Sequence, residues 1–149
     1  MKIKQVSFKD LDEISLLEKS VFNQNAFSEV LIKKLIRRNL FFLKLEKNKI
    51  KKEIIGFVIV VKDRLDRANI INFLINPKYH KKGYGSYLLY DTVQKIKELN
   101  DIKKIVLNVQ VENSSAIKLY RKFGFKIVQR IDQYYQSKED AYLMELEII

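Results

Sequence analysis

Ile70–Leu99, IINFLINPKYHKKGYGSYLLYDTVQKIKEL, is the stretch that decides the fold. Its first residues, 70–75, are mostly apolar and stop at Asn76-Pro77, which is typical of a strand that runs into a turn. After Ser86, apolar residues recur at helical spacing, at positions 88, 89, 93, 96 and 99. The stretch therefore predicts a strand, a loop and a helix, in that order.

The loop between them, His80-Lys81-Lys82-Gly83-Tyr84-Gly85, has the composition of an anion-binding turn. Glycine lets the backbone approach a ligand closely or take a positive φ. The first N–H groups of a helix have no partner within it, and the helix dipole makes this end positive. Two glycines before a helix also suit a plain turn, and neither a P-loop nor a three-glycine dinucleotide fingerprint is present. The preceding basic residues favour a site for phosphate groups.

Length and composition predict one domain over residues 1–149, because a chain of 149 residues that is 47% hydrophobic can bury a substantial core. The chain has no Cys and one His, so we expect no disulfide, no cysteine nucleophile and no metal site. The longest apolar run, 54–61, is much shorter than the roughly 20 residues that span a bilayer. Because the N-terminus also lacks the apolar core of a signal peptide, we expect a cytoplasmic protein without membrane contact.

The net charge of +11 is compatible with nucleic-acid binding. However, the basic residues are mostly lysines scattered along the chain, and aromatic residues are not interleaved with them as a stacking platform requires. We interpret the charge as a solvated basic surface and expect no direct contact with nucleic acid. A positive surface still favours acidic partners such as phosphate groups or a ribosome.

Periodicity along the rest of the chain predicts an α/β (α+β) fold without an internal repeat. Strands are predicted at 2–8, 40–46, 53–62, 70–75, 105–111, 125–131 and 141–148, and helices at 11–22, 28–36, 86–99 and 114–123. Polar turns are predicted at 47–52 and 63–68. In the first helix, Glu18 falls among the apolar positions of the helical repeat, which are Leu11, Ile14, Leu17 and Val21.

Helix ends are predicted from residues that favour capping. Asp10 and Glu13 have the spacing of a capping box for the first helix. Ser28 and Asn113 are expected to cap the second and fourth helices, and Gly124 suits the end of the fourth.

Two motifs resemble the GCN5-related N-acetyltransferase (GNAT) superfamily. The loop His80-x-x-Gly83-x-Gly85 resembles its acetyl-CoA signature R/Q-x-x-G-x-G/A, with His80 in place of the usual Arg or Gln. The segment NSSAIKLYRKFGF, 113–125, matches the superfamily pattern N-x-x-A-x-x-L-Y-x-x-x-G-F. Alone, this segment also suits an ordinary capped amphipathic helix with Tyr120 in the core. Both motifs together, in this order, identify the chain as a member of the superfamily.

The resemblance implies the GNAT fold and its cofactor. The expected sheet is mixed, mostly antiparallel and of about seven strands, splayed between the strands at 70–76 and 105–111, with about four helices. The expected cofactor is acetyl-CoA. The residues implied in binding it are Phe73, Leu74, Ile75, Lys81, Lys82, Gly83, Tyr84, Gly85, Ser86, Asn113 and Tyr120.

Acetyl transfer to an amine needs a polarised thioester carbonyl, an acceptor for the amine proton and an acid for the departing thiolate. By resemblance, a backbone N–H near Ile75 binds the acetyl carbonyl and Tyr120 is the catalytic acid. Asn113 is implied as a hydrogen-bond partner of the cofactor. No covalent intermediate is needed, which agrees with the absence of Cys.

The C-terminal part is similar to RimI-type protein N-terminal acetyltransferases. It contains Arg130-x-x-x-Tyr134-Tyr135 and then Glu139-Asp140-Ala141. The resemblance implies that Tyr134 and Tyr135 cover a peptide N-terminus, such as that of a ribosomal protein, although adjacent loop tyrosines also simply pack against a hairpin. We further expect a monomer or weak homodimer.

One position departs from that group. RimI-type enzymes carry a glutamate as general base on the strand before the Asn113 motif, and Asn108 is the matching residue here. A neutral amide cannot act as that base. We assign Asn108 to acceptor binding, and three explanations stay open: a chain of waters, another carboxylate such as Glu29 or Glu112, or a different substrate.

The leading hypothesis is an acetyl-CoA-dependent N-acetyltransferase acting on protein N-termini. The alternatives are a small-molecule amine acetyltransferase, for example one acting on polyamines or aminoglycosides, and a CoA-binding or RNA-associated module without catalysis. Asn108 and the charge of +11 motivate the last alternative.

Overall fold

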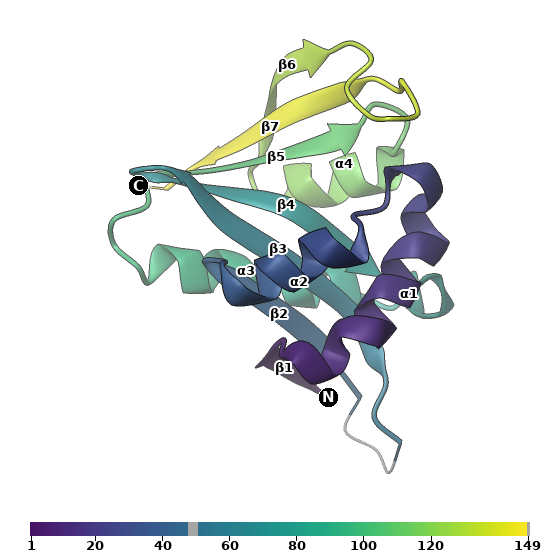
Figure 1. Cartoon of the computed structure of the whole chain (residues 1–149). Helices are drawn as coiled ribbons and strands as arrows, with labels where there is room; N and C mark the ends of the chain where they lie inside the picture. Colours follow the sequence, from purple (N-terminus) through teal and green to yellow (C-terminus); the bar gives the residue numbers. More distant parts are fainter. Residues whose placement is uncertain (48–50, 149) are drawn as a thin grey trace.

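The computed structural model describes residues 1–47 and 51–148, and it contains a seven-stranded sheet with helices on both faces (Figure 1). The strands are β1 (Lys2–Gln5), β2 (Phe41–Glu46), β3 (Ile54–Arg64), β4 (Arg67–Ile75), β5 (Lys104–Gln110), β6 (Lys126–Ile131) and β7 (Ala141–Glu147). The helices are α1 (Leu11–Phe22), α2 (Glu29–Arg37), α3 (Tyr84–Lys97) and α4 (Ser114–Lys122). Short 3-10 turns occupy Phe8–Asp10, Asn23–Asn25 and Pro77–Tyr79. The predicted α/β fold with a mostly antiparallel sheet is confirmed.

The sheet splays between its two parallel strands. Its order is β1-β2-β3-β4-β5-β7-β6, and among the described strands only the β4–β5 pair is parallel. That pairing covers just 67–70 against 104–107. Beyond it, β4 continues to Ile75 against β3, and β5 continues to Gln110 against β7. The sheet therefore opens at the C-terminal ends of the parallel strands, at the predicted place.

Two hydrophobic clusters occupy the two faces of the sheet. Helices α1 and α2 cover one face, with Ile14 and Ile32 fully buried, and helices α3 and α4 cover the other (Figure 1). Strand β3 serves both clusters, because its side chains alternate between the faces. Burial of each large apolar side chain contributes about 1.5–3 kcal/mol, so the packing holds both helix layers firmly against the splayed sheet.

The predicted capping box of α1 is wrong. Asp10 instead accepts a hydrogen bond from the Ser7 N–H at 2.9 Å, because a 3-10 turn precedes the helix and shifts the cap back by one turn. Glu13 accepts from the N–H of Ile54 at 2.8 Å and so fastens α1 to β3. The predicted caps Ser28 and Asn113 are confirmed, since each accepts the backbone N–H of the third residue of its helix.

Some element ends also differ from prediction. Helix α3 begins at Tyr84 instead of Ser86, because Gly83 at φ +83° is its N-cap. Strands β3 and β4 extend into the predicted turn at 63–68, where Asp63 accepts two hydrogen bonds from Arg67 at 2.8 and 2.9 Å. Residues 48–50 of the other predicted turn lie outside the described residues.

Candidate active site

Two cavities meet where the sheet splays. One, the glycine-loop cavity, measures about 350 Å3 and lies among the end of β4, the loop before α3, and α4. The other, the amide-lined cavity, measures about 120 Å3 and lies among α1, β4, β5 and the loop after β6. Both are lined by Phe22, Phe73, Asn113 and Tyr120. These four residues mark the junction between the cavities.

The two glycines of the loop have different roles. Gly83 lies at φ +83°, which favours glycine, and no described atom lies within 4 Å of the place where its side chain would be. A Cβ at Gly85 would lie 3.4 Å from Leu119 and 3.8 Å from Ile75, so this residue allows α3, α4 and β4 to approach one another. The N–H groups of the first turn of α3 have no partner within the helix. An anion can therefore approach the backbone at Gly83.

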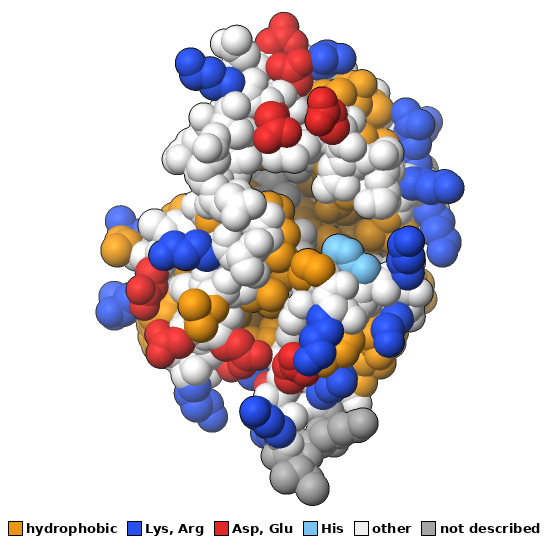
Figure 2. All heavy atoms as spheres, turned by 90° about the vertical axis from the view of Figure 1, so that its right-hand side faces the viewer, with side chains coloured by type: hydrophobic (Ala, Val, Ile, Leu, Met, Phe, Trp, Pro, Cys, Tyr) orange, Lys and Arg blue, Asp and Glu red, His pale blue; other side chains and the backbone are white. Residues whose placement is uncertain are grey.

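His80, the departure from the superfamily signature, fastens the loop to the strand. Its Nε2 lies 2.7 Å from the carbonyl oxygen of Ile75. The side chain is exposed at the rim of the glycine-loop cavity. Figure 2 shows the single histidine of the chain beside a hollow with hydrophobic walls, and Lys and Arg side chains lie on the surface around it. His80, which stands in place of the usual Arg or Gln of the signature, thus keeps the loop in contact with the end of β4.

The predicted cofactor residues fall into two groups. Lys82 and Ser86 line neither cavity, and Lys82 is exposed. The others line the glycine-loop cavity, and these are Phe73, Leu74, Ile75, Lys81, Gly83, Tyr84, Gly85, Asn113 and Tyr120. Tyr79 and His80 line the same cavity but were not predicted as binding residues. In the sequence, His80 is the first residue of the glycine motif and Tyr79 directly precedes it, and these positions could have indicated a binding role.

Tyr120 is the titratable residue at the junction. It is 6% exposed and packs against Phe73 and Phe125, with ring centroids 6.1 and 5.9 Å away. Burial raises the pKa of its phenol well above the ordinary value, and the nearby Tyr135 adds to this rise. Tyr120 therefore keeps its proton at neutral pH, and its phenol is present as a hydrogen-bond donor. Asn113 at the same junction caps α4 through Oδ1, which accepts the Ala116 N–H at 3.2 Å, and its Nδ2 donates to no side chain or backbone group of the described residues.

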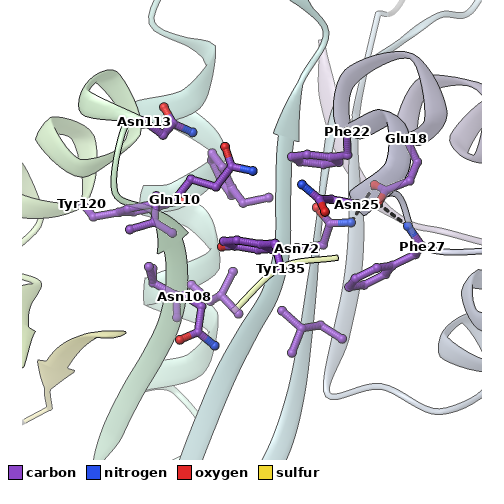
Figure 3. Close-up of a pocket in the computed structure, with 15 residues that line it drawn as sticks. Glu18, Phe22, Asn25, Phe27, Asn72, Asn108, Gln110, Asn113, Tyr120 and Tyr135 are labelled. Carbon is purple, nitrogen blue, oxygen red and sulfur yellow. Dashed lines mark hydrogen bonds between the residues drawn. The ribbon is translucent and has the colours of Figure 1, made fainter. Parts of the chain in front are cut away.

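Side-chain amides supply most of the polar groups that line the second cavity, and the rest of its lining is mainly apolar. Figure 3 shows Asn72 from β4, Asn108 and Gln110 from β5, and Asn25 from the turn after α1 around the ring of Tyr135. Asn108 Nδ2 donates to the hydroxyl of Tyr134 at 3.1 Å, while its Oδ1 is buried without a partner among the described residues. Amide donors and acceptors at this density match the backbone of a peptide.

The loop 132–140 covers the amide-lined cavity. Tyr135 lines the cavity, whereas Tyr134 does not and contacts it only through Asn108. The loop is fastened to the turn after α1 by two hydrogen bonds, because Asn25 Nδ2 donates to Ser137 Oγ and the Ser137 N–H donates to Asn25 Oδ1, each at 3.0 Å. Burial raises the pKa of the Tyr135 phenol above its usual range.

A buried carboxylate in this cavity was not predicted as a site residue. Glu18 on α1 is 1% exposed, and it accepts the Phe27 N–H at 2.9 Å and Asn72 Nδ2 at 2.6 Å. Burial raises the pKa of its carboxyl, although both hydrogen bonds act in the opposite direction. In the sequence, the signal that could have indicated this site residue is the position of Glu18 among the apolar residues of the helical repeat. The two carboxylates that the sequence suggested as alternative bases lie outside these cavities. Glu29 lines neither cavity, and Glu112 lines a separate pocket with Arg130.

The described residues contain no cluster of three or more His, Cys, Asp or Glu side chains able to hold a metal ion. Within residues 1–47 and 51–148, no helix has the length and hydropathy needed to cross a bilayer.

The sequence establishes the family. Residues 8–125 match the model of the Acetyltransferase (GNAT) family, so the chain belongs to this family and the resemblance is confirmed. An N-alpha-acetyltransferase of Sulfurisphaera tokodaii is 37% identical over 78 residues, 52% of this chain and 47% of that protein. The [Ribosomal protein bS18]-alanine N-acetyltransferase of Escherichia coli is 32% identical over 87 residues, 56% of this chain and 58% of that protein. The chain thus matches about half the length of these curated relatives.

Solved structures share the whole fold. The ribosomal-protein-S18-alanine N-acetyltransferase from Escherichia coli superposes with a TM-score of 0.85 at 26% identity, covering 99% of this chain and 93% of that chain. Arabidopsis thaliana NAA60 in complex with acetyl-CoA has a TM-score of 0.86 at 18% identity and covers 99% of both chains. The second likeness concerns the fold alone.

Proposed function

We propose that this chain is an acetyl-CoA-dependent N-acetyltransferase that acetylates the α-amino group of protein N-termini. The observation that carries the proposal is the junction of two cavities of different character at Tyr120. Family membership and the N-terminal acetyltransferase relatives support it. We assign the whole described chain to this one catalytic domain.

The glycine-loop cavity fits acetyl-CoA. Unpaired N–H groups at the start of α3, the open space at Gly83 and the Lys81 ammonium group suit the phosphates of the cofactor. The apolar walls formed by Phe73, Leu74 and Ile75 suit its uncharged arm, and Asn113 Nδ2 is a free donor beside it. When bound, the cofactor supplies the activated acetyl thioester.

The residues at the junction perform the proton chemistry. Tyr120 holds its proton at neutral pH. Because it lines both cavities at their junction, we assign to it the donation of that proton to the sulfur as the thiolate charge develops. Beyond Ile70, β4 no longer pairs with β5 but stays paired with β3. The backbone N–H groups near Ile75 that point away from β3 are therefore available to bind the acetyl carbonyl. Phe22 and Phe73 border both cavities and give the junction apolar walls.

The amide-lined cavity fits the acceptor. Its volume of about 120 Å3 is enough for the first residue of a chain, which presents one amine and the amide groups of a backbone. Asn72, Asn108 and Gln110 offer matching donors and acceptors. The loop that carries Tyr135 would cover the first residue of the bound acceptor. A RimI-like activity on a ribosomal protein is the specific form we propose, since the relative from Escherichia coli is named for such a substrate.

The alternatives fit the site less well. A polyamine or an aminoglycoside carries several positive charges, but Glu18 is the only Asp or Glu among the described residues that line the amide-lined cavity. A CoA-binding module without catalysis would not need a buried tyrosine at the junction.

The release of free thiol from acetyl-CoA tests the proposal. A panel of peptides with Ala, Ser, Met and acidic N-terminal residues is compared with spermidine and an aminoglycoside. We expect turnover on peptides with a free α-amine and none on the same peptides after N-terminal capping. Turnover on the small amines alone would establish the first alternative, and CoA binding without any turnover would establish the second.

A further inference from the structure

The proposed reaction needs a proton acceptor, and the family motifs do not identify the residue that has this role. The α-amino group of a peptide has a pKa of about 8, so it arrives mostly as an ammonium ion at neutral pH and must lose a proton before it attacks. Asn108 occupies the position of the expected base and cannot accept that proton.

Glu18 is the one candidate with the right location. Among the described residues, it is the only Asp or Glu that lines the amide-lined cavity. Figure 3 shows it on α1, across the cavity from Tyr120, with Asn72 and Tyr135 between them. Each oxygen of Glu18 accepts one hydrogen bond, from the Phe27 N–H at 2.9 Å or from Asn72 Nδ2 at 2.6 Å. Because a carboxylate has about four lone-pair sites, further acceptor capacity remains.

The charge of Glu18 is not compensated within the described chain. Two carboxylates are buried in the structure, Glu18 at 1% and Glu46 at 6% exposure. Glu46 is paired with Lys44 at 2.8 Å and with Lys4 at 3.4 Å, whereas no described Lys or Arg pairs with Glu18. A buried charge without a partner is costly. A positive group that enters the cavity would provide the missing partner, and the acceptor ammonium ion is such a group.

We propose that Glu18 binds the α-ammonium group of the acceptor and accepts its proton, directly or through one water in the cavity. The proposal rests on the function proposed above. The ammonium ion gives one proton to the Glu18 carboxylate, which leaves a neutral amine whose lone pair forms the new N–C bond as the C–S bond breaks. Tyr120 protonates the sulfur and regains a proton from the second N–H that the amine loses. The Glu18 proton passes to solvent after the product leaves.

The surroundings of Glu18 favour this role. Burial raises the pKa of its carboxyl toward that of the amine, which reduces the cost of proton transfer. The groups that face it are neutral: Asn72 on β4 and the backbone of Phe27 before α2. The other titratable side chains that line the cavity, Tyr120 and Tyr135, both have a raised pKa and stay uncharged at neutral pH. The acid limb of the rate profile is therefore expected to report Glu18.

The first test is the pH dependence of kcat/KM for a peptide acceptor. Glu18→Gln keeps the shape of the side chain but removes its basicity, so we expect kcat/KM at pH 7 to fall at least about 100-fold. The acid limb should move up to the pKa of the free amine. Glu13→Gln is the matched control, because Glu13 on the same helix also accepts a backbone N–H, at 2.8 Å, yet lines neither cavity. Its profile should keep the wild-type shape.

A second variant keeps the carboxylate in place. Asn72→Ala removes a donor that stabilises the charged form of Glu18, so the acid limb should shift to higher pH. A Glu18 that served only to hold the helix would change the rate without moving this limb.

A binding measurement without cofactor completes the test. Wild-type protein should bind a peptide with a free N-terminus at least about 10-fold more tightly than the same peptide after acetylation, and Glu18→Gln should bind both equally. An unchanged pH profile in Glu18→Gln, or a preference for the free amine that survives the substitution, would overturn the role of Glu18 alone. A wild-type protein inactive on every amine would overturn the proposed function, and this role with it.

Discussion

Replacement of Tyr120 by Phe isolates the proposed acid step, because it removes one hydroxyl group and leaves the packing in place. The ring would still contact Phe73 and Phe125 at centroid distances near the present 6.1 and 5.9 Å. No hydrogen bond to the Tyr120 hydroxyl is present among the described residues, so the fold loses little when it is removed. We expect the free energy of unfolding to change by less than about 1 kcal/mol.

The catalytic effect should be much larger. General acid catalysis contributes about 100-fold to 10,000-fold to the rate, so kcat should fall at least about 100-fold, equivalent to about 2.7 kcal/mol. The affinity for CoA, measured by calorimetry, should stay within about threefold, because the phosphate-binding loop and the walls of the glycine-loop cavity are untouched.

Two comparisons identify the step that is lost. An acetyl thioester whose thiol is more acidic needs no proton from Tyr120, so it should restore most of the lost rate. Tyr142→Phe is the matched control, because this tyrosine packs against the same core without lining either cavity. If Tyr120→Phe released thiol at the wild-type rate, or if the more acidic thiol gave no recovery, Tyr120 would not be the acid.

Three further predictions concern the loop, the cover and the core. Gly83→Glu should weaken CoA binding at least about 10-fold in calorimetry, because it strains a positive φ and places a carboxylate where the phosphates are expected; unchanged affinity would move the phosphate site elsewhere. Asn25→Ala removes both hydrogen bonds to Ser137, worth about 1 kcal/mol each, so the KM for peptides should rise about 10-fold with kcat and CoA affinity unchanged; an equal loss for spermidine would contradict this role. Pairing with Lys44 lowers the pKa of Glu46 below its ordinary value of 4.5, so its contribution to stability is complete above that pH and is lost as the pH falls further. Glu46→Gln should therefore lower the free energy of unfolding in urea by about 2 kcal/mol at pH 7 and flatten its decline in acid, whereas a parallel decline would assign the acid sensitivity to other groups.

The sequence predicted the elements whose signals are local. The strand at Ile70, the glycine loop and the following helix were predicted in the right order because apolar periodicity and glycine act within a few residues. The pattern of residue types predicts the start of α3 at Ser86, because it does not report that Gly83 takes φ +83°. The capping box was assigned to Asp10 and Glu13 for a similar reason, since a single 3-10 turn moved it to Ser7 and Asp10.

The acceptor side could not be predicted in this way because its contacts join distant segments. Asn25 meets Ser137 across 112 residues, and Glu18 meets Asn72 across 54 residues. A family motif predicts the residues of the cofactor-binding side, because that side is built from consecutive residues around Gly83 and Asn113. The amide-lined cavity is built instead from a helix, two strands and a distant loop, so its polar groups become visible together only in the folded chain.

Glu18 and Glu46 show how the same residue type serves two purposes in one domain. Glu46 is buried beside Lys44, so its charge is satisfied when the chain folds, and its expected effect is on stability. Glu18 is buried beside neutral donors only, so folding leaves part of its desolvation cost in place. That residual cost favours the binding of a cation, and in this cavity the cation is the group that must be deprotonated. Substitution of Glu46 should therefore lower stability with little change in turnover. Glu18→Gln should mainly lower turnover, and the loss of one of its two accepted hydrogen bonds should cost about 1 kcal/mol of stability. If both substitutions changed mainly the same quantity, the distinction between a structural and a catalytic carboxylate would fail for this chain.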